Sequence, residues 1–241
     1  MIPLLHITTF ICACFCFFVV RKLYFSYKES RDKNIGNFLK TFILAGIYFI
    51  AVSLPGLVVS DPFWVQVLYI FGYIPLFLSP VFILNIAFNL YHLPGKKYIF
   101  PSILTIIIVT TVLSIIFFAP SEASSADGVF YYWLEKTPLW LRDFDGVMIT
   151  FLIAGGAFLF LNGGRKVEDK ILKIRSILLG TGLSILAVAI SLNYIVALHA
   201  ISKTVKMWSV FSAGFLSLFG VVAILIGIYY KTQKKTKIII N

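Results

Sequence analysis

The sequence predicts an all-α polytopic membrane protein, and three observations carry that prediction. First, 60% of the 241 residues are hydrophobic and only 13% are charged, which is more apolar surface than a soluble domain of this length encloses. Second, the apolar stretches run for about 15 to 24 residues, near the length of a membrane-spanning helix. Third, cations gather between these stretches on alternate sides. We expect one membrane domain over residues 1–241.

Seven spans account for the apolar stretches. The expected spans cover residues 2–20, 41–59, 67–90, 102–119, 147–161, 177–200 and 208–230. The short alternating segments that build a membrane β-barrel do not occur, so a helical bundle is the expected architecture.

The positions of the cations predict the orientation. This threading puts 17 of the 21 Lys and Arg residues on one side, and positive loops face the cytoplasm. The N-terminus is therefore expected outside and the C-terminus inside. The net charge of +11 reflects contact with anionic lipid rather than with nucleic acid. The clearest cytoplasmic cluster, expected to couple the bundle to its surroundings, consists of Arg165, Lys166, Lys170, Lys173 and Arg175.

Two prolines lie in the third span. Pro75 and Pro80 each remove a backbone hydrogen-bond donor in mid-membrane, which predicts a kinked central helix. Because they are five residues apart, we treat them as hinge candidates.

Residues 120–146 form the longest interruption between spans. Aromatic residues such as Tyr132, Trp133 and Trp140 predict a segment lying along the outer interface. Asp143 and Asp145 have the spacing with which lipid-linked transferases hold a divalent metal, but capping of the fifth span is the favoured interpretation.

Ionisable residues in mid-span mark ion pathways, and the seven predicted cores contain no Asp, Glu, Lys or Arg. Pumping and retinal binding are therefore disfavoured. Cys12, Cys14 and Cys16 all lie within the first apolar span, which argues against a zinc cluster. Apart from the alternative at Asp143 and Asp145, we expect no metal, no cofactor and no enzymatic activity.

The segment KIRSILLG, residues 173–180, resembles the basic entry to the sixth span of the seven-helix sensor regions of bacterial histidine kinases and diguanylate cyclases. The basic first loop leading to Asn37 and Phe38 and the opposite placement of the termini agree with this resemblance. It implies a sensor that meets its ligand in the outer half of the bundle. Since only about eleven residues follow Tyr230, the output would require a separate cytoplasmic signalling protein.

Polar and aromatic residues gather at the level where such a ligand would bind. Asn within a span either joins helices or lines a pocket, and a lone interfacial His is usually solvated. The candidate ligand-binding residues are Asp61, Trp64, Asn193, His199 and Trp208.

The sequence thus favours a sensor or receptor that transmits an extracytoplasmic or intramembrane signal to cytoplasmic loops. A small-solute transporter or channel is the first alternative, and a water-lined path to Asn85 and Asn89 would favour it. A lipid-diphosphate enzyme with a metal at Asp143 and Asp145 is the second. The absence of Asn-x-Ser/Thr sites points to a bacterial inner membrane.

Overall fold

The computed structural model describes residues 3–94, 96–126 and 130–230. Within those residues, seven helices are long and apolar enough to cross a membrane, when α6 and its continuation to His199 are counted as one. The elements are α1 (Leu4–Ser30), α2 (Lys33–Leu57), α3 (Pro62–Leu90), α4 (Lys96–Ile116), β1 (Glu122–Ala126), β2 (Phe130–Leu134), α5 (Leu139–Lys166), α6 (Lys170–Ser191), the π-helix η1 (Leu192–Val196), α7 (Ala197–His199) and α8 (Lys203–Tyr229).

The helices are longer than the apolar stretches that predict them. The fifth span, expected over residues 147–161, lies inside the 28 residues of α5, and α1 continues through Lys22 and Lys28 to Ser30. Backbone hydrogen bonds cannot be left open near a bilayer, so a helix continues past its apolar core until a cap ends it. The C-terminal tail with Lys231 to Lys237, which is expected on the cytoplasmic side, lies outside the described residues.

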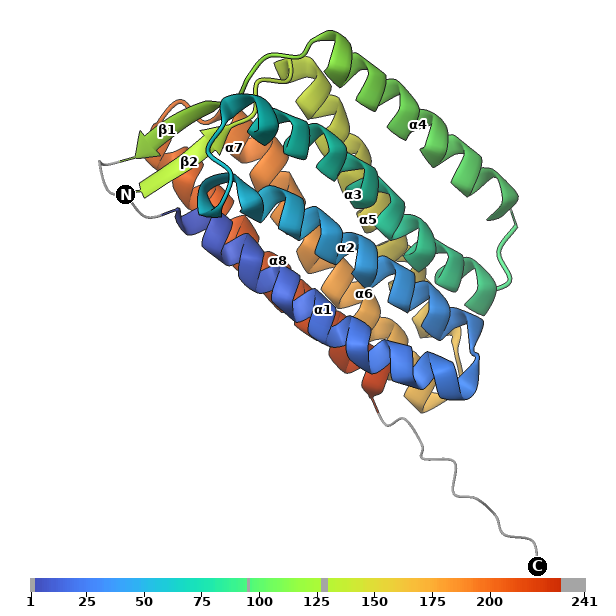
Figure 1. The fold of residues 1–241 in the computed structure, drawn as a ribbon. Helices are drawn as coiled ribbons and strands as arrows, with labels where there is room; N and C mark the ends of the chain where they lie inside the picture. Colours follow the sequence, from blue (N-terminus) through green and yellow to red (C-terminus); the bar gives the residue numbers. More distant parts are fainter. Residues whose placement is uncertain (1–2, 95, 127–129, 231–241) are drawn as a thin grey trace, which may run out of the picture.

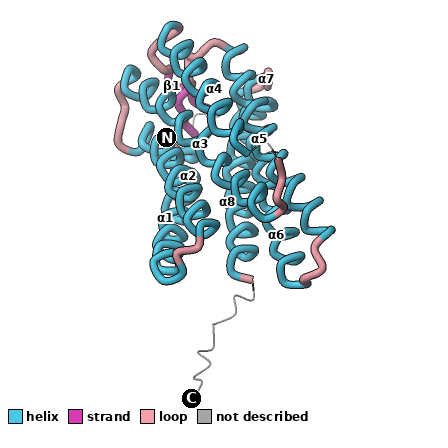
Figure 2. Tube along the Cα trace, turned by 90° about the vertical axis from the view of Figure 1, so that its right-hand side faces the viewer, coloured by secondary structure: helices cyan, strands magenta, loops and turns pink. Residues whose placement is uncertain are grey.

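Six helices form a ring, and α4 lies outside it against α3. Around the ring the packing order is α1, α2, α3, α5, α6 and α8, with α8 returning to α1 (Figures 1 and 2). The β-hairpin covers one end of the ring, which we call the hairpin end. The opposite end, which we call the basic end, holds the α1–α2, α3–α4 and α5–α6 turns.

The hairpin differs from the interfacial aromatic segment that the sequence predicts. β1 and β2 pair antiparallel, with Glu122 opposite Leu134, and Tyr132 and Trp133 are buried. Only Trp140, beyond the hairpin, is exposed as expected. The fully buried Gln66 of α3 fastens the hairpin, because its Oε1 accepts hydrogen bonds from Ser121 Oγ at 2.8 Å and from the Lys136 backbone N–H at 3.1 Å.

The helix break lies in α2 rather than in α3. α3 runs without interruption through Pro75 and Pro80, whereas α2 leaves helical geometry at Pro55 and Gly56. Gly56 has φ +85°, and a Cβ there would lie 2.5 Å from the ring of His6 on α1. Glycine is therefore required at this break both by the backbone angle and by the packed histidine.

Close helix approach occurs mainly between α6 and α8. A Cβ on Gly182 would lie 2.7 Å from the carbonyl oxygen of Gly220, and a Cβ on Gly220 would lie 2.9 Å from that of Gly182. Contacts of this kind are typical of glycines at membrane-helix interfaces. The adjacent glycines of α5 differ, because Gly155 has open space beside it and a Cβ on Gly156 would meet Leu183 at an ordinary 3.5 Å.

Candidate ligand cavity

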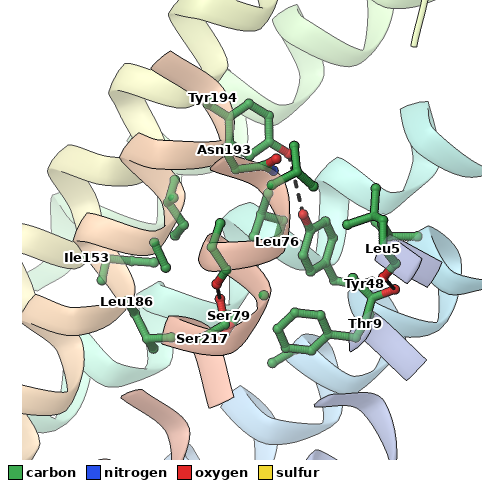
Figure 3. Close-up of a pocket in the computed structure, with 18 of the residues that line it drawn as sticks. Leu5, Thr9, Tyr48, Leu76, Ser79, Ile153, Leu186, Asn193, Tyr194 and Ser217 are labelled. Atoms are coloured by element: carbon green, nitrogen blue, oxygen red, sulfur yellow. Dashed lines mark hydrogen bonds between the residues drawn. The ribbon is translucent and has the colours of Figure 1, made fainter. Parts of the chain in front are cut away.

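A cavity of about 220 Å³ lies inside the six-helix ring. Each ring helix contributes to its wall, and β2 contributes at the hairpin end. α4, which lies outside the ring, contributes nothing to the lining. Figure 3 shows part of the wall, with Tyr48 of α2 and Tyr194 of η1 pointing toward one another. The ring arrangement therefore creates the cavity, since its walls come from segments more than 200 residues apart in sequence.

Charged residues border the cavity at the hairpin end. Arg142 of α5, Lys206 of α8 and Glu135 of the connection after β2 all line it. Arg142 Nη1 donates to the backbone oxygen of Glu135 at 3.2 Å. The buried Nε of Arg142 has no hydrogen-bond partner among the described residues. Arg142 thus brings to this part of the cavity a cationic side chain with one donor that the described residues do not satisfy.

The Glu135 carboxyl is held by two hydroxyl groups. Tyr73 Oη donates to Glu135 Oε2 at 2.8 Å, and Thr137 Oγ1 donates to Oε1. Burial raises the pKa of Glu135, and this effect outweighs the two hydrogen bonds and the positive charge of Arg142, which lower it. Gln66 Nε2 donates to Thr137 Oγ1 at 3.2 Å, so the network continues to the residue that fastens the hairpin.

Tyrosines continue this polar region toward the middle of the bundle. The hydroxyl oxygens of Tyr48 and Tyr194 lie 3.5 Å apart, and the ring centroids of Tyr73 and Tyr194 lie 6.1 Å apart. Tyr194 belongs to η1, and π-helical turns are frequent at functional sites because they redirect side chains. A Cβ on Gly146 of α5 would lie 2.4 Å from the Tyr194 Cβ, so α5 supports η1 directly.

Asp145 lies behind this tyrosine group. Its side chain is only 1% exposed, and within the described part of the chain neither carboxyl oxygen has a hydrogen-bond partner. The prediction that Asp145 caps the fifth span is wrong, because α5 begins at Leu139 and Asp145 occupies its second turn. Asp143 does not cap either: its Oδ1 lies 3.0 Å from His199 Nε2 and joins α5 to α7.

Beyond the charged end the lining is mostly apolar. Leu76, Ile153, Leu186 and Val221 are among the lining side chains, interrupted by a few hydroxyl groups. Two of these belong to Thr41 and Ser79, which exchange side-chain to backbone hydrogen bonds of 3.4 Å between α2 and α3. The cavity is therefore polar and charged at one end and apolar along its body.

Of the five candidate ligand-binding residues, Asn193 lines the cavity. The others lie at the same end of the bundle with other contacts. Asp61 caps α3, accepting from the backbone N–H groups of Phe63 and Trp64 at 3.0 and 3.1 Å. Trp64 and Trp208 are 58% and 52% exposed. His199 pairs with Asp143 at the surface.

The hinge and coupling candidates lie in different parts of the bundle. Pro80 lines the cavity, while Pro75 is buried within α3. The coupling cluster lies at the basic end on both sides of a three-residue turn, where Asp169 caps α6. Arg175 Nε donates to the Tyr230 backbone oxygen at 2.9 Å and so connects the start of α6 with the end of α8. The residues of that cluster are Arg165, Lys166, Lys170, Lys173 and Arg175.

Sequence reasoning missed Glu135, Arg142 and Lys206 as site residues. All three lie just outside the apolar cores, where charged residues are normally solvated. A signal was nevertheless present in the charge count. The less cationic side holds only four Lys and Arg residues, namely Lys136, Arg142, Lys203 and Lys206. Because Lys and Arg are usually depleted on this side of a membrane protein, the four that occur there are candidates for specific partners.

The helices and the cavity define the class, a multi-pass helical membrane protein with an internal cavity. Comparisons with known proteins found no matching family model, curated protein or solved structure. No group of three or more His, Cys, Asp or Glu side chains suited to a metal ion occurs in residues 3–94, 96–126 and 130–230.

Proposed function

We propose that this protein is a membrane sensor that binds a small molecule in the cavity and transmits occupancy to the basic end by helix movement. The observation that carries the proposal is the cavity, which connects the hairpin end with the middle of the bundle. A ligand there touches all six ring helices at once, so a change in occupancy acts on the packing between them.

The proposed orientation has the hairpin end outside and the basic end in the cytoplasm. The excess of cations at the basic end supports it, because such loops are retained on the cytoplasmic side. A bacterial inner membrane and a separate cytoplasmic signalling protein complete the proposal. The resemblance of residues 173–180 to the sensor regions of histidine kinases and diguanylate cyclases supports the same function.

Two contacts support transmission along the bundle. Ser79 and Pro80 both line the cavity. Because Pro80 has no backbone N–H, one backbone hydrogen bond of α3 is missing beside the cavity wall. On the other side of the ring, the closely packed helices α6 and α8 line the cavity and extend to the basic end, where Arg175 contacts Tyr230. Movement of either wall therefore reaches the turns of the basic end.

Two alternative functions have less support. The cavity lining does not include Asn85 or Asn89, the residues that a transport path was expected to reach. The metal-dependent enzyme requires Asp143 and Asp145 to converge, but Asp143 meets His199 at the surface while Asp145 is buried.

Spin labels at the basic end test the sensor function. Cys12, Cys14 and Cys16 are replaced by Ala, and labels are attached at Lys33→Cys and Glu168→Cys, both exposed positions beside the α1–α2 and α5–α6 turns. The distance between the labels is measured in lipid nanodiscs with decanoate, decanol or decylamine. At least one of these probes is expected to shift the distance distribution.

A blocked cavity provides the control. Ala213→Phe fills the cavity from α8, whereas Ala154→Phe adds the same bulk at an exposed position on α5. The first variant is expected to abolish the shift and the second to retain it. A distribution unchanged by every probe, or changed equally in the blocked protein, contradicts the sensor function.

A further inference from the structure

We propose that the ligand is an anionic amphiphile with one alkyl chain, whose headgroup binds Arg142 and Lys206 and whose chain occupies the apolar body of the cavity. This inference rests on the proposed function and adds the chemical class of the ligand. A carboxylate or a phosphate headgroup satisfies the same requirement.

Four cations lie at the hairpin end, and among the described residues two of them are not paired or solvated in an ordinary way. Lys136 Nζ pairs with Glu122 Oε2 at 2.7 Å, and Lys203 is exposed on the first turn of α8. The remaining two, Arg142 and Lys206, both line the cavity and are close enough to interact electrostatically. Neither has an ion pair with a described carboxylate. Two like charges facing one cavity are stabilised by an anion between them.

Glu135 does not supply that anion. Its two carboxyl oxygens already accept hydrogen bonds from Tyr73 and Thr137. Burial raises the pKa of Glu135, while the positive charge of Arg142 acts against that rise. The hydrogen bond from Arg142 to Glu135 goes to the backbone oxygen, and no described carboxylate forms an ion pair with the guanidinium.

The geometry of Arg142 also suits an anionic headgroup. Its Nε is buried and unpaired among the described residues, and a guanidinium binds carboxylate or phosphate oxygens through two parallel donors. Lys206 comes from α8, which α6 separates from α5 in the ring, and adds a second charge from another helix. A ligand anion would therefore connect α5 with α8.

The apolar lining and the volume of the cavity body limit the chemistry and size of the rest of the ligand. Its lining is largely apolar, and its volume of about 220 Å³ lies below the roughly 300–1,000 Å³ of pockets that hold drug-sized ligands. One alkyl chain of medium length fits these properties, since burying its apolar surface against the lining favours binding. A lipid with two long chains would extend beyond this volume.

Fluorescence of Trp133 gives a direct measure of binding. Trp133 is buried and lines the cavity, while Trp64, Trp140 and Trp208 are exposed and are replaced by Phe. Decanoate carrying bromine beside the carboxylate is titrated into this protein in nanodiscs, and the quenching gives a dissociation constant. Decanoate, decyl phosphate, decanol and decylamine then compete with it. Both anions are expected to bind at least tenfold more tightly than decanol or decylamine.

Charge variants test the headgroup contacts. Arg142→Gln and Lys206→Gln are each expected to weaken decanoate binding by about 10-fold to 150-fold, the range for hydrogen bonds to charged groups, and to leave decanol binding nearly unchanged. Arg142→Lys keeps the charge and is expected to retain the preference for anions. Lys203→Gln, on the same helix as Lys206 but outside the cavity, serves as the matched control with wild-type binding.

The position of the bromine tests the orientation of the ligand. Bromine beside the carboxylate is expected to quench Trp133 more strongly than bromine on the terminal carbon, because the chain points away from the hairpin end. Equal binding of decanol and decanoate, or stronger binding of decylamine, overturns the anionic class while the spin-label result still decides the sensor function. Displacement of decanoate by phosphatidate in the nanodisc overturns the single-chain assignment and identifies a membrane lipid as the occupant.

Discussion

Glu135 shows at the residue scale how the fold changes the chemistry of a side chain. It follows the hairpin in a connection that the sequence assigns to the membrane interface, yet it borders the cavity between two hydroxyl donors. Sequence alone could not place it there, because a single Glu between a strand and a helix is normally solvated. Its environment arises only when the hairpin folds over the ring.

The raised pKa of Glu135 leads to a pH-dependent stability. Below about pH 4.3, the ordinary pKa of Glu, both the folded and unfolded states hold the proton, and the contribution of Glu135 to the free energy of unfolding is complete. As the pH rises, the unfolded state releases its proton first, because its pKa is lower. The contribution of Glu135 is lost by the time the pH has passed the higher pKa of the folded state. Glu135→Gln is expected to reduce the decline of thermal stability above this pH.

The measurement is the unfolding midpoint in detergent between pH 4 and pH 8. Glu122→Gln is the matched control, because Glu122 pairs with Lys136 on the exposed side of the hairpin. It is expected to follow the wild-type decline. A Glu135→Gln protein with the same decline as the wild type shows that this carboxyl does not carry the effect.

At the scale of the elements, the helices could be predicted and the hairpin could not. Each predicted apolar core lies within or largely overlaps an observed helix, because only helices satisfy their own backbone in lipid. Residues 130–133 are aromatic, and aromatic residues suit both a membrane interface and a strand. The choice between the two depended on Gln66, a residue of α3 far away in sequence.

The break in α2 illustrates the same limit. Pro55 resembles Pro75 and Pro80 in sequence, but only Pro55 is followed by a glycine with positive φ. A proline alone leaves the helix able to continue when neighbouring groups compensate. The glycine after it permits the chain to turn, and His6 fills the space beside it.

The contact between α6 and α8 gives a test at this scale. Gly220→Ala places a methyl group 2.9 Å from the Gly182 oxygen and 2.7 Å from Leu186, so the two helices must separate. Overpacking of this kind costs about 1–3 kcal/mol, or roughly 2–12 °C in the unfolding midpoint. Gly155→Ala, where the space is open, is expected to leave the midpoint unchanged or to raise it. Equal midpoints for the two variants would show that the close α6–α8 contact is not required.

On the scale of the whole molecule, the number of helices and their apolar character follow from composition and length, as predicted. The closed order of six helices with α4 outside does not, because it depends on contacts such as Gly182 with Gly220 and Gly146 with Tyr194. For the same reason the sequence could not separate Asn193, which lines the cavity, from the other four candidate ligand-binding residues, which do not. The charged residues of the cavity become visible as a group only after the ring is closed.

The central claim is that a ligand enters this ring and lies with its chain toward the middle of the bundle. Photolabelling with decanoate that carries a diazirine on its terminal carbon tests it most directly, with the labelled residues identified by mass spectrometry. Labels are expected on cavity residues of α8 about one decanoate length along the helix from Lys206, such as Gly214 and Ser217, and these labels are expected to be lost in Ala213→Phe. Labels confined to exposed residues such as Phe151, Phe158 and Phe219 would contradict it.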